Sequence, residues 1–249
     1  MGNTWVTVAS LIFPGWKRLR KSLFRRALEA MIARGETVNI LQVGANDGVI
    51  NDPLYQFLRA HPDRTQVILV EPQEDLIVAL TEAYAFHPRK AIVQMAVGAM
   101  GCMTLYRVRK KCWPDLVLPY GKDWPDYRAP TGVTSGQRER LLHWVRKYYQ
   151  GALAPEAVIE TVEVDSVPTA ILIQRTGLFD RLDVLQIDAE GCDDLVIRAS
   201  DIAALRPRLI HFEAAHLGAA RLATISEELE VLGYQIEPQG LDCLARRRD

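Results

Sequence analysis

The chain has 249 residues, of which 49% are apolar and 24% are charged. These proportions suit one large globular domain with appendages. The formal net charge of −1 gives no overall field that would attract nucleic acid, so we expect no nucleic-acid partner. The four cysteines lack the paired spacing of a zinc site, and we expect reduced thiols in a cytoplasmic protein.

Residues 1–36 form a basic leader. Its apolar stretch 5–13 is too short to span a bilayer, and the basic residues follow it, whereas in a secretory signal they come first. Apolar residues at helical spacing predict an amphipathic helix: Trp16, Leu19, Leu23, Ala27 and Met31. We expect this helix to pack its apolar stripe on the domain. The alternative is peripheral contact with a membrane surface.

Residues 37–249 alternate between apolar strand-like runs and helical stretches. Strands are predicted at 38–43, 66–70, 91–97, 103–108, 182–187 and 208–212, helices at 53–60, 74–84, 137–149, 192–199 and 219–232, and a C-terminal antiparallel hairpin at 234–236 and 241–245. This order predicts an α/β fold with a doubly wound, Rossmann-like, mostly parallel sheet and helices on both faces. The carboxyl ends of the parallel strands then meet at one edge, where ligands bind.

Residues 109–160 interrupt this alternation with a segment rich in tryptophan and proline. It is too long for a simple connection, so we expect an insertion on the substrate side. Its aromatic side chains could line an acceptor pocket or form a lid over the cofactor. The alternative is an ordered excursion that only packs against the domain.

A glycine turn follows the first predicted strand, in the sequence Val43-Gly44-Ala45-Asn46-Asp47-Gly48. Gly44 and Gly48 would let the backbone approach a ligand closely, because side chains there would collide with it. The turn lacks the full glycine spacing of dinucleotide sites. Taken alone, it indicates a tight turn with several possible ligands.

Glu71 ends the second predicted strand, where an acidic side chain can accept both hydroxyls of a ribose. It could instead be a solvated acid before Pro72. The glycine turn upstream favours ribose binding. A ligand with adenosine and no pyrophosphate would explain the incomplete glycine set.

Further acidic residues follow the later strands, at the edge where ligands are expected. Asp188 and Glu190 come directly after the strand at 182–187, and Glu213 and His216 follow the next one. Carboxylates at the ends of buried strands are costly unless they bind something. We therefore expect Asp188, Glu213 and His216 to converge beside the cofactor.

In combination these motifs resemble the FkbM-type methyltransferases, a branch of the class I S-adenosylmethionine-dependent enzymes. The resemblance spans residues 38–216 and rests on these segments: 43–48 with 51–53, 70–72, 132–135, 161–167, 183–191, and Glu213 with His216. It implies O-methylation of a hydroxyl on a sugar or secondary metabolite. The cofactor S-adenosyl-L-methionine is expected to contact Gly44, Asn46, Asp47, Gly48, Asp52, Glu71, Pro72, Ala96, Val97, Ser135 and Asp188.

A hydroxyl acceptor must lose its proton as it attacks the methyl group. His216 is the expected base, because an imidazole titrates near neutral pH. Asp188 and Glu213 would orient it, hold the acceptor or bind a divalent cation, although no metal site is predicted. The alternatives are an NAD-dependent oxidoreductase on a similar fold and a catalytically inactive scaffold or nucleotide-binding protein. The expected partner is a small-molecule or glycan acceptor.

Overall fold

A seven-stranded sheet forms the centre of the computed structural model, which describes residues 22–248. Its strands are β1 Val38–Val43, β2 Thr65–Val70, β3 Lys90–Val93, β7 Val184–Ile187, β8 Leu209–Glu213, β9 Tyr234–Gln239 and β10 Asp242–Arg247. The order across the sheet is β3-β2-β1-β7-β8-β10-β9. The first five strands in this order run parallel, and β10 is antiparallel to both of its neighbours. The predicted parallel sheet and its C-terminal hairpin are therefore confirmed.

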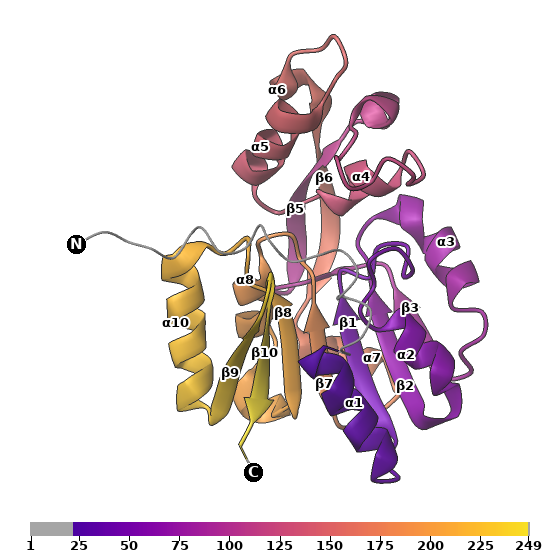
Figure 1. The fold of residues 1–249 in the computed structure, drawn as a ribbon, viewed down its shortest axis with the longest axis vertical. Coiled ribbons are helices and arrows are strands. Elements are labelled where there is room, and N and C mark those ends of the chain that lie inside the picture. The colour runs from indigo at the N-terminus through magenta and orange to yellow at the C-terminus, as the bar shows by residue number, and fades with distance from the viewer. Residues whose placement is uncertain (1–21, 249) are drawn as a thin grey trace, which may run out of the picture.

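Helices cover both faces of this sheet (Figure 1). On one face lie α1 Leu23–Ala33, α2 Tyr55–Ala60 and α3 Glu74–Ala83, and on the other lie α7 Thr169–Thr176, α8 Asp193–Ala199, α9 Ile202–Leu205 and α10 Gly218–Val231. A short 3-10 helix, Pro62–Arg64, follows α2. Successive strand residues alternate between the two faces, so Ile40 packs in the core under α1 while Leu41 packs in the core under α8.

Helix α1 is the described part of the predicted basic leader. Its buried residues are Phe24, Ala27, Leu28 and Met31, and they join the core that contains β1 and β2. Trp16 and Leu19 lie outside the described residues. Within residues 22–248 the helix therefore packs its apolar stripe on the domain, as we expected. No helix in that range is long and apolar enough to cross a membrane.

The predicted strand at 91–97 is wrong in one respect, because the structure breaks it in two. β3 ends at Val93, and β4 (Ala96–Val97) leaves the main sheet to pair with β6 (Ile159–Val167), which was not predicted as a strand. β5 (Gly101–Val108) pairs with β6 in antiparallel register over its whole length. β4, β6 and β5 thus form a second, three-stranded sheet.

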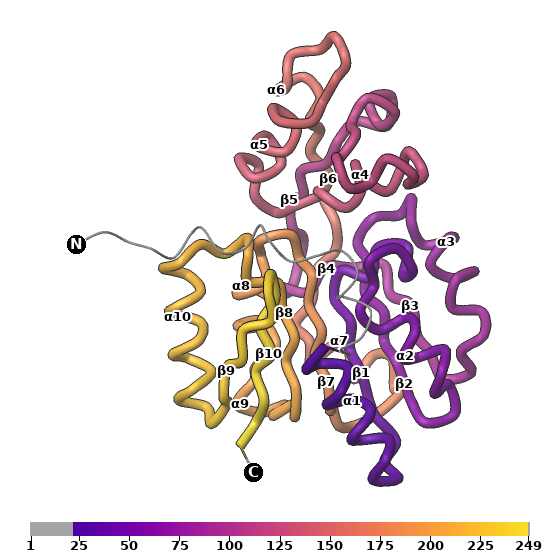
Figure 2. The backbone as a smooth tube through the Cα atoms, viewed as in Figure 1, coloured from indigo at the N-terminus to yellow at the C-terminus, as the bar shows by residue number. Residues whose placement is uncertain are grey.

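The insertion folds as a layer of its own at the far end of β5 and β6, beyond the upper edge of the main sheet (Figure 2). It holds a 3-10 helix, Lys110–Asp115, and the helices α4 Arg128–Gly132, α5 Arg138–Tyr148 and α6 Pro155–Val158. These elements share a separate hydrophobic core that includes Val108, Leu141 and Ile159. The four cysteines carry free thiols.

Candidate active site

A cavity of about 250 Å³ opens at the carboxyl ends of β1, β2 and β7, under the insertion. Most of the predicted cofactor-binding residues line it: Gly44, Asn46, Asp52, Glu71, Pro72, Ala96, Val97, Ser135 and Asp188. The predicted residues Asp47, Gly48, Glu213 and His216 do not. The strand order therefore brings distant segments to one site, as expected from a doubly wound sheet.

The glycine turn places backbone against backbone at the floor of the cavity. Gly44 has φ +78, and a Cβ added there would lie 1.9 Å from the backbone oxygen of Asp188. Nearby, the Asp188 amide donates to the Val43 carbonyl at 2.9 Å, which holds β7 against β1. Only glycine fits at this crossing, because the obstacle is a backbone atom that cannot swing aside.

Gly48 and Asp47 lie outside the cavity lining, and their contact with the cofactor stays a prediction. A Cβ at Gly48 would meet the side chains of Tyr84 and Leu80, so this glycine allows close packing against α3. The Asp47 carboxylate accepts the backbone amides of Val49 (2.9 Å) and Ile50 (3.0 Å) and is buried. Both residues shape the turn from behind the cavity wall.

Glu71 is buried at the cavity wall, and backbone donors hold its carboxylate in place. The amides of Asn46 and Gln73 donate to its two oxygens at 2.8 and 2.9 Å. Burial raises the pKa of Glu71, while these hydrogen bonds and the nearby Arg128 charge act in the opposite direction. A carboxylate accepts more than one hydrogen bond per oxygen, so this arrangement leaves acceptor capacity for ligand hydroxyls.

Two glutamines that sequence reasoning did not single out also line the cavity. Gln42 and Gln186 are register partners on β1 and β7, and each is 2% exposed. Gln42 donates to Asp52 at 2.6 Å, yet the Oε1 atoms of both glutamines have no hydrogen-bond partner. Because buried polar atoms are rarely left unpaired, these two oxygens indicate a place for donors from a ligand. The signal in the sequence was a glutamine one position before the end of each apolar run.

Asp188 and Glu190 bring negative charge to the edge of the cavity. Asp188 lines the cavity and keeps an exposed surface. Burial, followed by the charge of Glu213, raises the pKa of Asp188 to about 7. Burial and the charges of Asp188 and Glu213 raise the pKa of Glu190 well above its usual value, although Arg140 pairs with it at 3.0 Å.

Beside this edge, Glu213 and His216 form a tight pair. His216 Nδ1 lies 2.5 Å from Glu213 Oε2 and 3.7 Å from Glu190 Oε2. Suitable atoms of Glu190, Glu213 and His216 all lie within 4.8 Å of one another, so the three could also hold a metal ion. Of the residues predicted to converge, Glu213 and His216 thus lie together beside Glu190, outside the cavity lining. Asp188 and Glu190 line the cavity.

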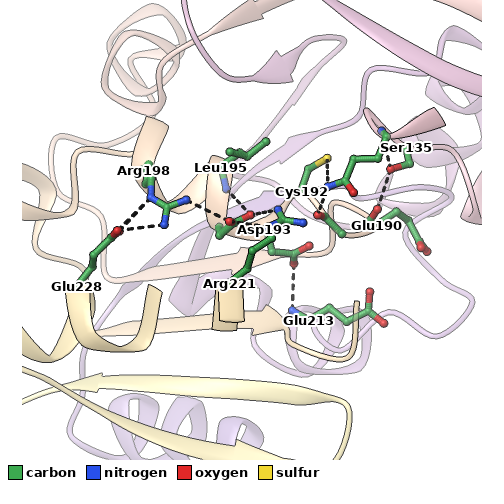
Figure 3. A network of polar contacts seen from close by, with 12 residues as sticks. Ser135, Glu190, Cys192, Asp193, Leu195, Arg198, Glu213, Arg221 and Glu228 are labelled. Atoms are coloured by element: carbon green, nitrogen blue, oxygen red, sulfur yellow. Dashed lines mark hydrogen bonds and ion pairs between the residues drawn. The ribbon is translucent and has the colours of Figure 1, made fainter. Parts of the chain in front are cut away.

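Asp193, the first residue of α8, anchors this edge from below. Its Oδ1 accepts the Glu213 amide at 3.0 Å, as Figure 3 shows, while Oδ2 has no partner. Burial raises the pKa of Asp193 to about 8, and the charges of Asp188 and Glu213 add to the effect. Burial and the mutual repulsion of these carboxyls therefore favour their protonated forms at this edge.

The insertion closes the cavity from above and is tied to both sides of it. On one side Gln73 Nε2 donates to the Thr131 carbonyl at 3.1 Å. On the other, Ser135 Oγ donates to the Glu190 carbonyl at 2.8 Å and Gln137 donates to the Gly191 carbonyl at 2.6 Å. Lining residues from this segment, not predicted apart from Ser135, are Arg128, Thr131, Gly132, Thr134, Gly136 and Gln137.

Comparison with known proteins gives one family and a set of distant structures. The family model described as "Methyltransferase FkbM domain" matches residues 42–236. A search of curated proteins found no match. Among solved structures, the SAH-bound methyltransferase PaMTH1 of Podospora anserina is 10% identical, with a TM-score of 0.43, and the alignment covers 90% of this chain and 77% of that one.

Two further similar structures are a fibrillarin and a carbon methyltransferase. The fibrillarin of Aeropyrum pernix with natively bound S-adenosyl-L-methionine is 12% identical, with a TM-score of 0.39 and coverage of 88% and 74% of the two chains. The CurJ carbon methyltransferase is 10% identical, with a TM-score of 0.41 and coverage of 90% and 53%.

Proposed function

The chain belongs to the family of methyltransferase FkbM domains, and we propose that it transfers a methyl group from S-adenosyl-L-methionine to a hydroxyl oxygen of a small-molecule or glycan acceptor. Family membership decides against the NAD-dependent oxidoreductase. Free thiols are in keeping with a cytoplasmic protein. The acidic edge of the cavity favours an acceptor other than a nucleic acid.

The residues around the cavity fit this methyl donor. Glu71 offers carboxylate oxygens for the ribose hydroxyls, and the unpaired Oε1 atoms of Gln42 and Gln186 offer acceptors for the donor's ammonium group. Gly44 lets β1 and β7 approach each other closely at the cavity floor. When bound, S-adenosyl-L-methionine supplies a methyl group on a positively charged sulfur, which leaves with the electron pair of the carbon–sulfur bond.

The observation that carries oxygen as the acceptor atom is the His216–Glu213 pair. His216 Nδ1 lies 2.5 Å from Glu213 Oε2, so in the neutral tautomer that carries its proton on Nδ1 this nitrogen donates to the carboxylate and Nε2 keeps the lone pair. Nε2 has no hydrogen-bond partner among residues 22–248. As the acceptor oxygen bonds to the methyl carbon, Nε2 takes the hydroxyl proton, and Glu213 stabilises the resulting imidazolium.

The test compares His216→Gln with His143→Gln, an exposed histidine of α5 that makes no hydrogen bond in the structure. Methyl transfer to a panel of sugars and alcohols is followed by mass spectrometry, and S-adenosylhomocysteine binding by calorimetry. His216→Gln should lower kcat by about 10²–10⁴-fold, with unchanged S-adenosylhomocysteine affinity. His143→Gln should behave as the unmodified protein.

Two results would argue against the proposal. Full turnover of His216→Gln at every pH would remove His216 as the base, and a product methylated at carbon would remove oxygen as the acceptor. Binding of S-adenosylhomocysteine without turnover of any acceptor would support the alternative of an inactive scaffold.

A further inference from the structure

Arg128, the first residue of α4, is the one cationic side chain among the described residues that line the cavity. The other ionisable side chains of the lining are acidic, from Asp52, Glu71, Asp188 and Glu190. The Arg128 side chain is only 12% exposed. Burying a guanidinium costs free energy unless the group is paired and hydrogen-bonded, so its partners decide what it can bind.

The Arg128 guanidinium is fixed in place while most of its donors stay unused. Nη2 donates to the Ile50 carbonyl at 2.9 Å, and Cζ lies 5.2 Å from the centre of the Trp124 ring. Nε is buried without a hydrogen-bond partner, because Asp47 Oδ2 lies 3.7 Å away. Nη1 makes no hydrogen bond within the described residues and lies against Gly132, where an added Cβ would come within 2.3 Å of it. A guanidinium held in this way can donate two parallel hydrogen bonds to a carboxylate.

The glycine turn beside Arg128 has no backbone donor to spare for an anion. Every backbone amide of residues 44–50 already donates to an acceptor within the chain, such as the Val70 carbonyl or the carboxylates of Asp47 and Glu71. In turns that bind anions, such amides point at the ligand instead. Arg128 is therefore the group that can compensate a negative charge at this wall of the cavity.

Arg128 also lies at the same end of the cavity as Gln42, whose unpaired Oε1 offers an acceptor to the ammonium group of the methyl donor. Arg128 bonds to Ile50, and Asp52, two residues further along, accepts from Gln42 at 2.6 Å. Two residues of chain span at most about 7 Å. An α-amino acid carries its ammonium and its carboxylate on one carbon atom, so the partners of the two groups must lie close together.

We propose that Arg128 binds the carboxylate of the methionine moiety of S-adenosyl-L-methionine. This inference rests on the proposed function, in which that methyl donor occupies the cavity. Because Arg128 belongs to the insertion, the segment above the cavity then contacts the methyl donor directly. A ligand without the carboxylate gains nothing from Arg128, so this residue determines donor specificity.

The experiment compares S-adenosylhomocysteine with S-adenosylthiopropylamine, which is the same molecule without its carboxylate. Each ligand is titrated by calorimetry into the full chain. The unmodified protein should bind S-adenosylhomocysteine about tenfold or more tightly, because only this ligand makes charged hydrogen bonds with Arg128. The ammonium group is common to both ligands, so the comparison isolates the carboxylate and needs no variant.

Matched variants assign the difference to Arg128. Arg128→Gln should weaken S-adenosylhomocysteine binding by about tenfold or more and change the affinity for S-adenosylthiopropylamine little. Arg128→Lys should restore part of the loss, because the charge returns without the planar fork. Arg107→Gln is the control, since Arg107 of β5 pairs with Asp75 and Glu160 at 3.0 and 2.7 Å and does not line the cavity. It should leave both affinities unchanged.

The outcomes separate this inference from the proposed function. Failure of the unmodified protein to bind S-adenosylhomocysteine would remove the methyl-donor site itself, and the role of Arg128 with it. Normal S-adenosylhomocysteine binding with equal or tighter binding of S-adenosylthiopropylamine would overturn only the role of Arg128. An equal fall for both ligands in Arg128→Gln would also overturn it, because the arginine would then only hold the cavity wall in shape.

Discussion

Replacing Gly44 by alanine tests the central claim about the cavity floor, namely that two backbones cross there with no room for a side chain. Gly240, in the turn between β9 and β10, is the matched control. Both glycines have φ +78, but a Cβ at Gly240 would meet nothing within 4 Å, while a Cβ at Gly44 would lie 1.9 Å from the Asp188 oxygen. The two substitutions therefore share the cost of a left-handed alanine and differ only in the collision.

The shared cost is about 1–2 kcal/mol. At Gly44 the backbones must also move apart by about 1.5 Å or more, from 1.9 Å to an ordinary contact of at least 3.4 Å, which strains the bond between the Asp188 amide and the Val43 carbonyl. Overpacking and the weakened hydrogen bond add about 2–4 kcal/mol together. For a chain of this size that excess is about 4–16 °C in Tm.

Urea unfolding followed by tryptophan fluorescence gives the free energy of unfolding of both variants, and calorimetry gives their affinity for S-adenosylhomocysteine. We expect Gly240→Ala to bind S-adenosylhomocysteine normally and Gly44→Ala to bind it weakly or not at all. Equal destabilisation of the two variants, or normal binding by Gly44→Ala, would refute the reasoning.

Three other predictions concern protons and metal. The Asp188 carboxyl, with its pKa raised to about 7, gains its charge as the pH rises through that value. The affinity for S-adenosyl-L-methionine should therefore rise several-fold between pH 6 and pH 8. The affinity for S-adenosylhomocysteine, whose sulfur carries no charge, should rise less. An equal rise in the Asp188→Asn variant would contradict this prediction. Burial lowers the pKa of His211 to about 4. Between about pH 6.5 and pH 4 the imidazole is therefore protonated in the unfolded chain and neutral in the folded protein, which lowers the free energy of unfolding as the pH falls. The free energy of unfolding of the unmodified protein should fall as the pH drops over that range, and the fall in His211→Phe should be smaller by up to about 3 kcal/mol. Urea titrations at each pH measure both. An equal fall in the two proteins would contradict the prediction. Finally, methyl transfer should survive EDTA, whereas loss of turnover with recovery on adding Mn²⁺ would make Glu190, Glu213 and His216 metal ligands.

The fold was largely predictable from the sequence because the parallel strands of its main sheet are short, largely apolar runs. Val38–Val43 and Val184–Ile187 are buried along almost their whole length, so their composition alone identifies them. The run at 91–97 was read as one strand because its residues stay largely apolar while the chain changes sheets after Val93. Its second half pairs with residues some 70 positions later in the chain, and no local pattern records that partner.

Cavity-lining residues could be predicted from the sequence where they directly follow a strand, but not where they come from the insertion. Glu71 and Asp188 follow directly from the strand ends. The lining residues Arg128 and Gln137 come from the insertion, whose position depends on long-range bonds such as that between Gln137 and Gly191. The packing of Gly48 against Tyr84 and Leu80 was not predictable, because a glycine that lets a helix pack closely has the same letter as one that admits a ligand.

The register between β5 and β6 has a consequence for protein engineering. Val108 and Ile159 are paired residues in that ribbon, so the whole segment between them begins and ends at one point on the scaffold. The segment also carries its own hydrophobic core, separate from the cores on the two faces of the main sheet. Residues 109–158 therefore form a unit that can be exchanged with the same segment of a relative. The exchange would also replace the cavity-lining residues between Arg128 and Gln137, while β1, β2 and β7 keep their sequence.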